Sequence, residues 1–156
     1  MSDTDPRKVA ERYGATVELL ERALGGEADA LRQVLTDRGV AVGWDDDVDV
    51  FHDGRLMDGA YNDAREEVFA ELDDWPLELV PTFTGFDFGP DSLRELTVVV
   101  AAGGPHVELV VDGGDWLTVR AAWWSAPVDV RVCAPAVAAY WWELGESLVP
   151  THTERR

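Results

Sequence analysis

Between residues 94 and 132 the chain repeats one pattern, in which short valine-rich segments are separated by glycine-rich turns such as Gly103-Gly104-Pro105 and Gly113-Gly114. Apolar and polar residues alternate within these segments, which places the apolar side chains on one face of a strand, and short glycine turns join antiparallel neighbours. The strands predicted from this pattern lie at 94–102, 106–112, 116–124 and 128–132. Residues 77–84 are typical of an edge strand, because Pro81 has no backbone N–H to donate. The pattern therefore predicts a mostly antiparallel sheet of about four strands.

Helical spacing of apolar residues dominates the rest of the chain. Residues 6–38 predict a helical hairpin interrupted at Gly25-Gly26, residues 60–75 a third helix, and residues 135–148 a C-terminal helix that packs on the sheet. Asp53-Gly54 favours a tight turn inside a small two-stranded element at 48–57. We expect a single α+β domain over 1–156, with a mainly helical part at 6–75 and the sheet with its C-terminal helix at 77–148.

Charge excludes several classes of partner. The 31 acidic residues outnumber 13 basic ones, the formal net charge is −18, and Lys8 is the only lysine. Such a field repels phosphate backbones and anionic membranes and attracts cationic surfaces, so we expect no direct binding to nucleic acid or membrane. Two explanations compete: adaptation of a halophile's whole proteome, or a specific acidic face that imitates nucleic acid. No transmembrane or signal segment is visible, and we expect a soluble, cytoplasmic protein.

Acidic residues gather beside tryptophans at two places. Trp44 precedes the Asp cluster of residues 45–49, and Trp75 follows the acidic end of the third predicted helix. Adjacent tryptophans elsewhere point to different faces of their element, so some indoles must lie outside the core. Aromatic anchors beside carboxylates suit a partner rich in Arg and Lys. The predicted partner-binding residues are Trp44, Asp45, Asp46, Asp47, Asp49, Glu66, Glu67, Asp73, Asp74, Trp75, Trp124 and Trp142.

Metal and catalytic motifs are weak by comparison. Asp45, Asp47 and Asp49 match the first ligands of a calcium loop, but Val50 and Leu56 replace the required Gly and Glu, so we expect no metal or other cofactor. His106, with Asp112 or Asp115 as its partner, and Cys133 are the alternative catalytic candidates. We expect Cys133 instead to be packed where the last strand meets the C-terminal helix.

One stretch resembles a known group. Residues 95–119, ELTVVVAAGGPHVELVVDGGDWLTV, resemble the strand–GGP–strand hairpin of small uncharacterised phage-type proteins. The resemblance implies a viral accessory protein, and small acidic phage proteins include DNA mimics that block restriction or CRISPR enzymes. Together with the acidic residues and tryptophans, this leads to the hypothesis of a non-enzymatic inhibitor or adaptor that docks on a basic surface of a nucleic-acid-processing protein. A halophile's soluble domain and a small enzyme using His106 or Cys133 are the alternatives.

Overall fold

The computed structural model of the chain describes residues 5–39, 51–52, 55–56, 58–84, 92–102, 105–124 and 126–148. Contacts within the chain divide it into two compact units. Met1–Ala15 and Pro76–Arg156 form one of them, called here the sheet unit, and Thr16–Trp75 forms the other, called the helical unit. Both contain regular elements at the places where the sequence predicts them.

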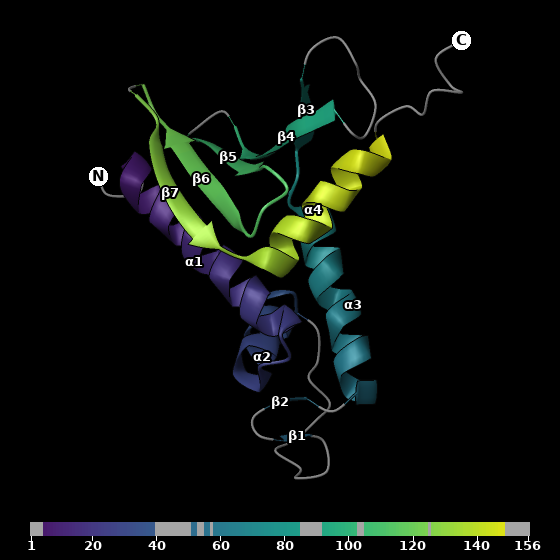
Figure 1. Ribbon diagram of the computed structural model, residues 1–156. Helices are drawn as coiled ribbons and strands as arrows, with labels where there is room; N and C mark the ends of the chain where they lie inside the picture. Colours follow the sequence, from purple (N-terminus) through teal and green to yellow (C-terminus); the bar gives the residue numbers. More distant parts are fainter. Residues whose placement is uncertain are drawn as a thin grey trace. The chain divides into compact units, whose positions relative to one another are not determined.

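The sheet unit contains one five-stranded antiparallel sheet with the strand order β3-β4-β5-β6-β7 (Figure 1). Its strands are β3 (Glu78–Phe83), β4 (Leu93–Ala101), β5 (His106–Val111), β6 (Trp116–Ala122) and β7 (Val128–Cys133). The predicted α+β class and antiparallel pairing are confirmed, but the sheet has five strands where about four were expected. The strand beyond the expected count is β3, which lies within residues 77–84, where the sequence is typical of an edge strand. Its Pro81 lies opposite Leu96 at the sheet edge, where a missing N–H is tolerated.

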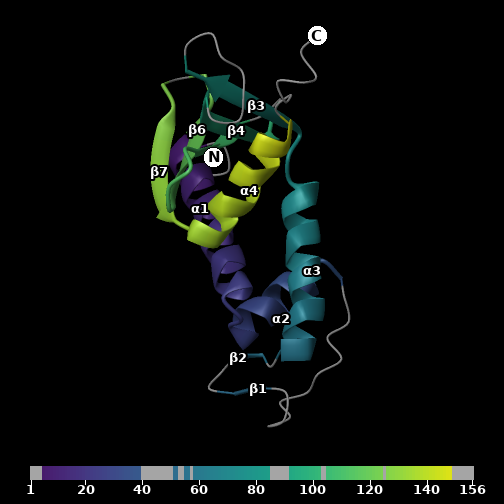
Figure 2. The same ribbon diagram turned by 45° about the vertical axis from the view of Figure 1, so that its right-hand side comes forward.

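Strand register places the apolar residues of the sheet on one face, called here the covered face. Leu96, Val111, Leu117 and Val132 form one continuous row of paired positions across β4 to β7. Helix α4 (Pro135–Leu148) contacts β4, β5 and β6, and the start of α1 (Pro6–Leu24) lies beside β7 in both views (Figures 1 and 2). Removing these apolar residues from water supplies the main stabilisation of the unit.

Two glycines allow the helices to approach the covered face closely. A Cβ on Gly145 of α4 would lie 3.0 Å from Leu96 Cδ2, and one on Gly14 of α1 would lie 3.3 Å from Val132 Cγ2. A larger residue at Gly145 would therefore press against a strand residue that is itself buried. The helices can sit this close to the sheet because these positions carry no side chain.

The helical unit contains the remainder of α1, α2 (Ala28–Asp37) and α3 (Asp58–Asp74), as well as the short antiparallel pair β1 (Phe51–His52) and β2 (Arg55–Leu56). Each of these elements was predicted. Asp5 caps α1 by accepting a hydrogen bond from the Arg7 backbone N at 3.0 Å. Gly26, with φ of 86°, turns the chain between α1 and α2 in a conformation that few residues other than glycine adopt. The buried apolar residues of the unit are Val17, Leu20, Ala23, Leu24, Ala30, Leu31, Val34, Leu35, Ala64, Val68 and Leu72.

In the part of the chain that the structure describes, no helix is both long and apolar enough to span a bilayer.

Candidate functional site

The negative charge is unequally divided between the two units. The helical unit contains 17 acidic and five basic residues, a net charge of −12, whereas the sheet unit contains 14 acidic and eight basic residues, a net charge of −6. The helical unit is also the shorter of the two. Any cationic partner is therefore attracted most strongly by residues 16–75.

Arg38 holds several carboxylates of α3 within the helical unit. Its guanidinium lies 2.7 Å from Glu71 Oε2, 3.1 Å from Asp74 Oδ2 and 3.4 Å from Glu67 Oε2. The hydrogen bond that Arg38 donates to Glu71, followed by the one it donates to Asp74, raises the pKa of Arg38, so the guanidinium stays charged. This network connects the end of α2 to α3, and it means that Glu67 and Asp74 take part in holding the unit together.

The other predicted binding residues on α3 face the solvent. Glu66 and Asp73 are exposed, whereas Trp75 is half-buried and donates its Nε1–H to Glu71 Oε1 at 3.0 Å. The remaining predictions in this unit, Trp44, Asp45, Asp46, Asp47 and Asp49, lie outside the described residues. Glu66, Glu67, Asp73 and Asp74 thus lie on the second half of α3, and Trp75 directly follows the helix.

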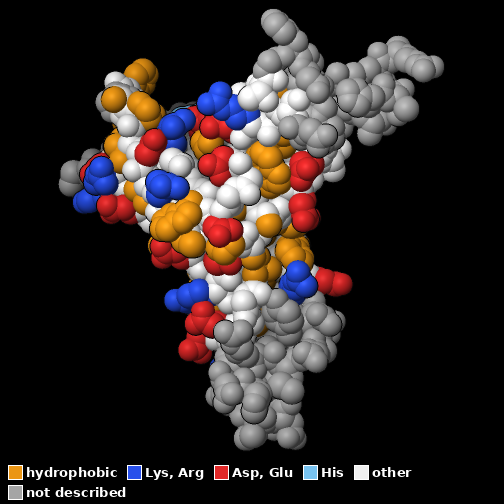
Figure 3. Space-filling model, viewed as in Figure 1, with side chains coloured by type: hydrophobic (Ala, Val, Ile, Leu, Met, Phe, Trp, Pro, Cys, Tyr) orange, Lys and Arg blue, Asp and Glu red, His pale blue; other side chains and the backbone are white. Residues whose placement is uncertain are grey.

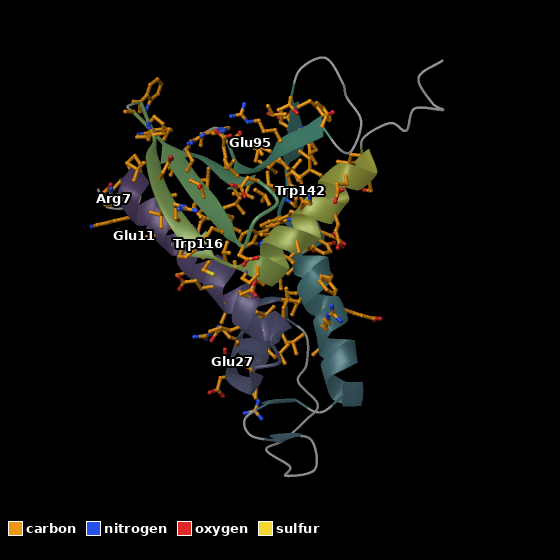
Figure 4. The ribbon with its side chains drawn as sticks, viewed as in Figure 1. Arg7, Glu11, Glu27, Glu95, Trp116 and Trp142 are labelled. Carbon is orange, nitrogen blue, oxygen red and sulfur yellow. The ribbon has the colours of Figure 1, made fainter. Side chains whose placement is uncertain are left out.

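Adjacent tryptophans of α4 have opposite environments. Trp141 is 0% exposed and is the largest fully buried side chain of the described chain. Trp142 is half-buried, and its ring lies against the β5–β6 turn, where a Cβ on Gly113 would come within 3.2 Å of Cε2 (Figure 4). Trp142, a predicted binding residue, therefore packs on Gly113 within the sheet unit.

Among the described residues, the most exposed indole belongs to Trp124, two residues after the end of β6. Its side chain is 90% exposed, and its backbone is left-handed, with φ of 59°. Trp123 supports it edge to face, with ring centroids 5.3 Å apart and an interplanar angle of 68°. The sequence signal for this exposure is the Trp-Trp pair itself, because neighbouring residues cannot enter the same core.

The second face of the sheet, called here the open face, is polar. Only Val99 is buried among its strand residues, at 8% exposure. Glu108, Arg120 and Asp129 form one row across β5, β6 and β7, and Arg120 binds Asp129 through two bonds of 2.9 and 3.1 Å. The hydrogen bond to Asp129 is the main cause that raises the pKa of Arg120, helped by the charges of Glu108 and Glu95. Over the sheet and α4, acidic and basic side chains are interspersed on the face shown in Figure 3.

The catalytic alternatives are far apart on the sheet. His106 pairs with Ala122 at one end of β6, and Cys133 pairs with Trp116 at the other end, about 20 Å away at the usual rise of a strand. His106 Nε2 lies 3.5 Å from Glu108 Oε1, so the expectation that His106 meets Asp112 or Asp115 is wrong, because both follow the opposite end of β5. Cys133 is exposed, so the expectation that it is packed is also wrong. Its side chain alternates onto the open face.

In the described ranges, no group of three or more His, Cys, Asp or Glu residues is arranged to hold a metal ion.

Comparisons with known proteins add no relative. Neither a family model nor a curated protein nor a solved structure matches the chain.

Proposed function

We propose that the protein is a non-enzymatic, acidic protein-binding module that docks on a basic surface. The partner we propose is a nucleic-acid-processing protein, which the module inhibits by occupying the groove that normally receives the phosphate backbone. The observation that carries this proposal is the net charge of −12 within the helical unit. A cationic groove that binds nucleic acid attracts a surface of this charge for the same electrostatic reason.

The arrangement of α3 supports the proposal. Glu66 and Asp73 are exposed. The carboxylates of Glu67, Glu71 and Asp74 share the guanidinium of Arg38, so three negative charges face one positive charge in this network. Trp75, next to these acids, supplies an aromatic side chain of the kind that anchors interfaces. In this proposal the carboxylates accelerate the encounter, while indole rings contribute the short-range affinity.

A second proposal is that the acidity is environmental. It is supported by the sheet unit, where acidic and basic side chains are interspersed in the view of Figure 3, and by Lys8 being the only lysine. Under this proposal the protein is a halophile's soluble domain, and the carboxylates keep it hydrated in concentrated salt. The two proposals differ in whether the fold requires concentrated salt.

A salt titration of the wild-type protein separates them. We expect the far-ultraviolet circular dichroism and the melting temperature in about 20 mM KCl to be close to those in about 2 M KCl, because the described cores are apolar and Arg38 and Arg120 are already paired. Loss of helix signal or of a cooperative transition at low salt would support the environmental proposal instead. Choline chloride at the same concentrations serves as the control for specific effects of potassium.

A further inference from the structure

We propose that Trp124 is a receptor for an arginine side chain of the cationic partner, whose guanidinium stacks on the indole ring. The inference rests on the proposed function for the identity of the partner, and it adds a specific site on the sheet unit. It concerns a residue that lies outside the helical unit and its carboxylates.

The ring of Trp124 is largely open to solvent. At 90% exposure, it is the most exposed large hydrophobic side chain among the described residues, and its recorded ring contact is with Trp123 alone. This contact positions the indole and leaves most of it uncovered. An aromatic side chain that is both supported and uncovered can accept a flat cation on its face.

The backbone of Trp124 points to the same conclusion. A bulky residue in the left-handed region is an outlier, and glycine or asparagine would occupy the position without strain. Burial cannot account for tryptophan at this position, because the side chain is almost fully in solvent. Strain of this kind, held at an exposed position, is characteristic of binding sites.

Two other aromatic rings of the chain each have an arginine guanidinium stacked over them. Arg131 places its guanidinium carbon 5.2 Å from the centre of the Trp116 ring, and Arg65 lies 4.9 Å from that of Phe69. Within the part of the chain that the structure describes, no arginine or lysine is recorded over Trp124. Trp116 is 47% exposed and has an arginine from its own chain, whereas the described residues place none over Trp124.

Charge complementarity favours a cation over an apolar group as the occupant. The sequence at 123–127 contains no charged residue, so a guanidinium can approach the two indole rings without repulsion from it, while the protein as a whole carries −18 and attracts the cation. Arginine is favoured over lysine because its planar, weakly hydrated guanidinium stacks on an aromatic face.

Two cationic peptides of equal charge test the inference. Fluorescein-labelled nona-arginine and nona-lysine are titrated with the wild-type protein and with Trp124→Leu, and binding is followed by fluorescence anisotropy in dilute buffer. We expect the wild type to prefer nona-arginine, and Trp124→Leu to lose about tenfold in affinity for nona-arginine and much less for nona-lysine. Trp124→Phe should fall between the two, and Trp116→Leu is the matched control, with at most about a twofold change because Arg131 already occupies that ring.

Unchanged binding of nona-arginine by Trp124→Leu would overturn the inference. A loss with Trp124→Ala that Trp124→Leu restores would also overturn it, since an apolar contact alone would then explain binding. Failure of the proposed function gives a different result. In that case, lysine substitution of Asp45, Asp46, Asp47 and Asp49 lowers both affinities no more than lysine substitution of Glu11, Glu78, Asp115 and Glu143 does, while the Trp124 effect persists.

Discussion

Replacing Trp141 by alanine should lower the free energy of unfolding of the sheet unit by about 3 to 5 kcal/mol, the range found when large aromatic side chains are removed from a packed core. Trp141 is 0% exposed and lies on the buried side of α4 together with Val137, Ala138 and Gly145. The substitution removes the largest fully buried side chain and leaves a cavity that a helix against a sheet can close only in part. Urea unfolding followed by near-ultraviolet circular dichroism measures the loss.

The adjacent residue provides the control. Trp142→Ala removes the same side chain from a half-buried position against Gly113, and we expect a loss of about 1 kcal/mol. Equal losses at the two positions, or a larger one at Trp142, would show that α4 is rotated relative to the packing described above.

Replacing Gly145 by valine should cost about 2 to 3 kcal/mol, because the new side chain overfills the contact between α4 and β4. A Cβ at this position would already lie 3.0 and 3.3 Å from the two methyl carbons of Leu96, and 3.5 Å from Leu93 Cδ2. The two further methyl groups of valine have no room unless the helix moves away from the sheet. Thermal unfolding of the variant, compared with the wild type, measures the effect.

Ala139 is the matched control for Gly145→Val, because it lies on the exposed side of the same helix. Ala139→Val should cost only the lower helix propensity of valine, about 0.5 kcal/mol. If Gly145→Val were as mild as Ala139→Val, the close approach of α4 to Leu96 would be wrong.

The alternation of apolar residues in strands and their helical spacing elsewhere were sufficient to predict where most helices and strands lie. Val107, Leu109 and Val111 alternate with polar residues, and all three are buried, as the strand pattern requires. Helix α4 begins and ends at the predicted residues, since Pro135 suits the first turn and Trp141 continues the apolar stripe. Strand β3 lies within residues 77–84, where an edge strand was predicted, but the expected count of about four strands left it out because Pro81 weakens the strand pattern.

The spacing of hydrophobic residues could not predict the close packing at Gly145 or the ion pairs of Arg38. Gly145 has no side chain, so it does not contribute to a pattern of apolar residues. Of the two glycines at which a helix packs on the sheet, it is nevertheless the one where an added Cβ would come closest to a strand residue. Arg38 binds acids that lie 29, 33 and 36 residues further along the chain, and no local spacing predicts such pairs. The exposure of Trp124 was partly predictable, since Trp123 and Trp124 are adjacent, but its left-handed backbone was not.

The central claim, that carboxylates of the helical unit dock on a cationic protein, is tested most directly by affinity capture from the source cells with two charge-reversed baits. The first carries lysine at Asp45, Asp46, Asp47 and Asp49. The second carries lysine at four exposed acids of the sheet unit, Glu11, Glu78, Asp115 and Glu143. Both baits undergo the same change from the formal net charge of −18, because each contains four reversed carboxylates.

We expect the wild type and the second bait to recover the same basic partner, and the first bait to recover about tenfold less or none, since reversed charges repel the partner's cationic surface. Equal recovery by the two reversed baits, at the wild-type level, would contradict the claim for the Asp45–Asp49 cluster.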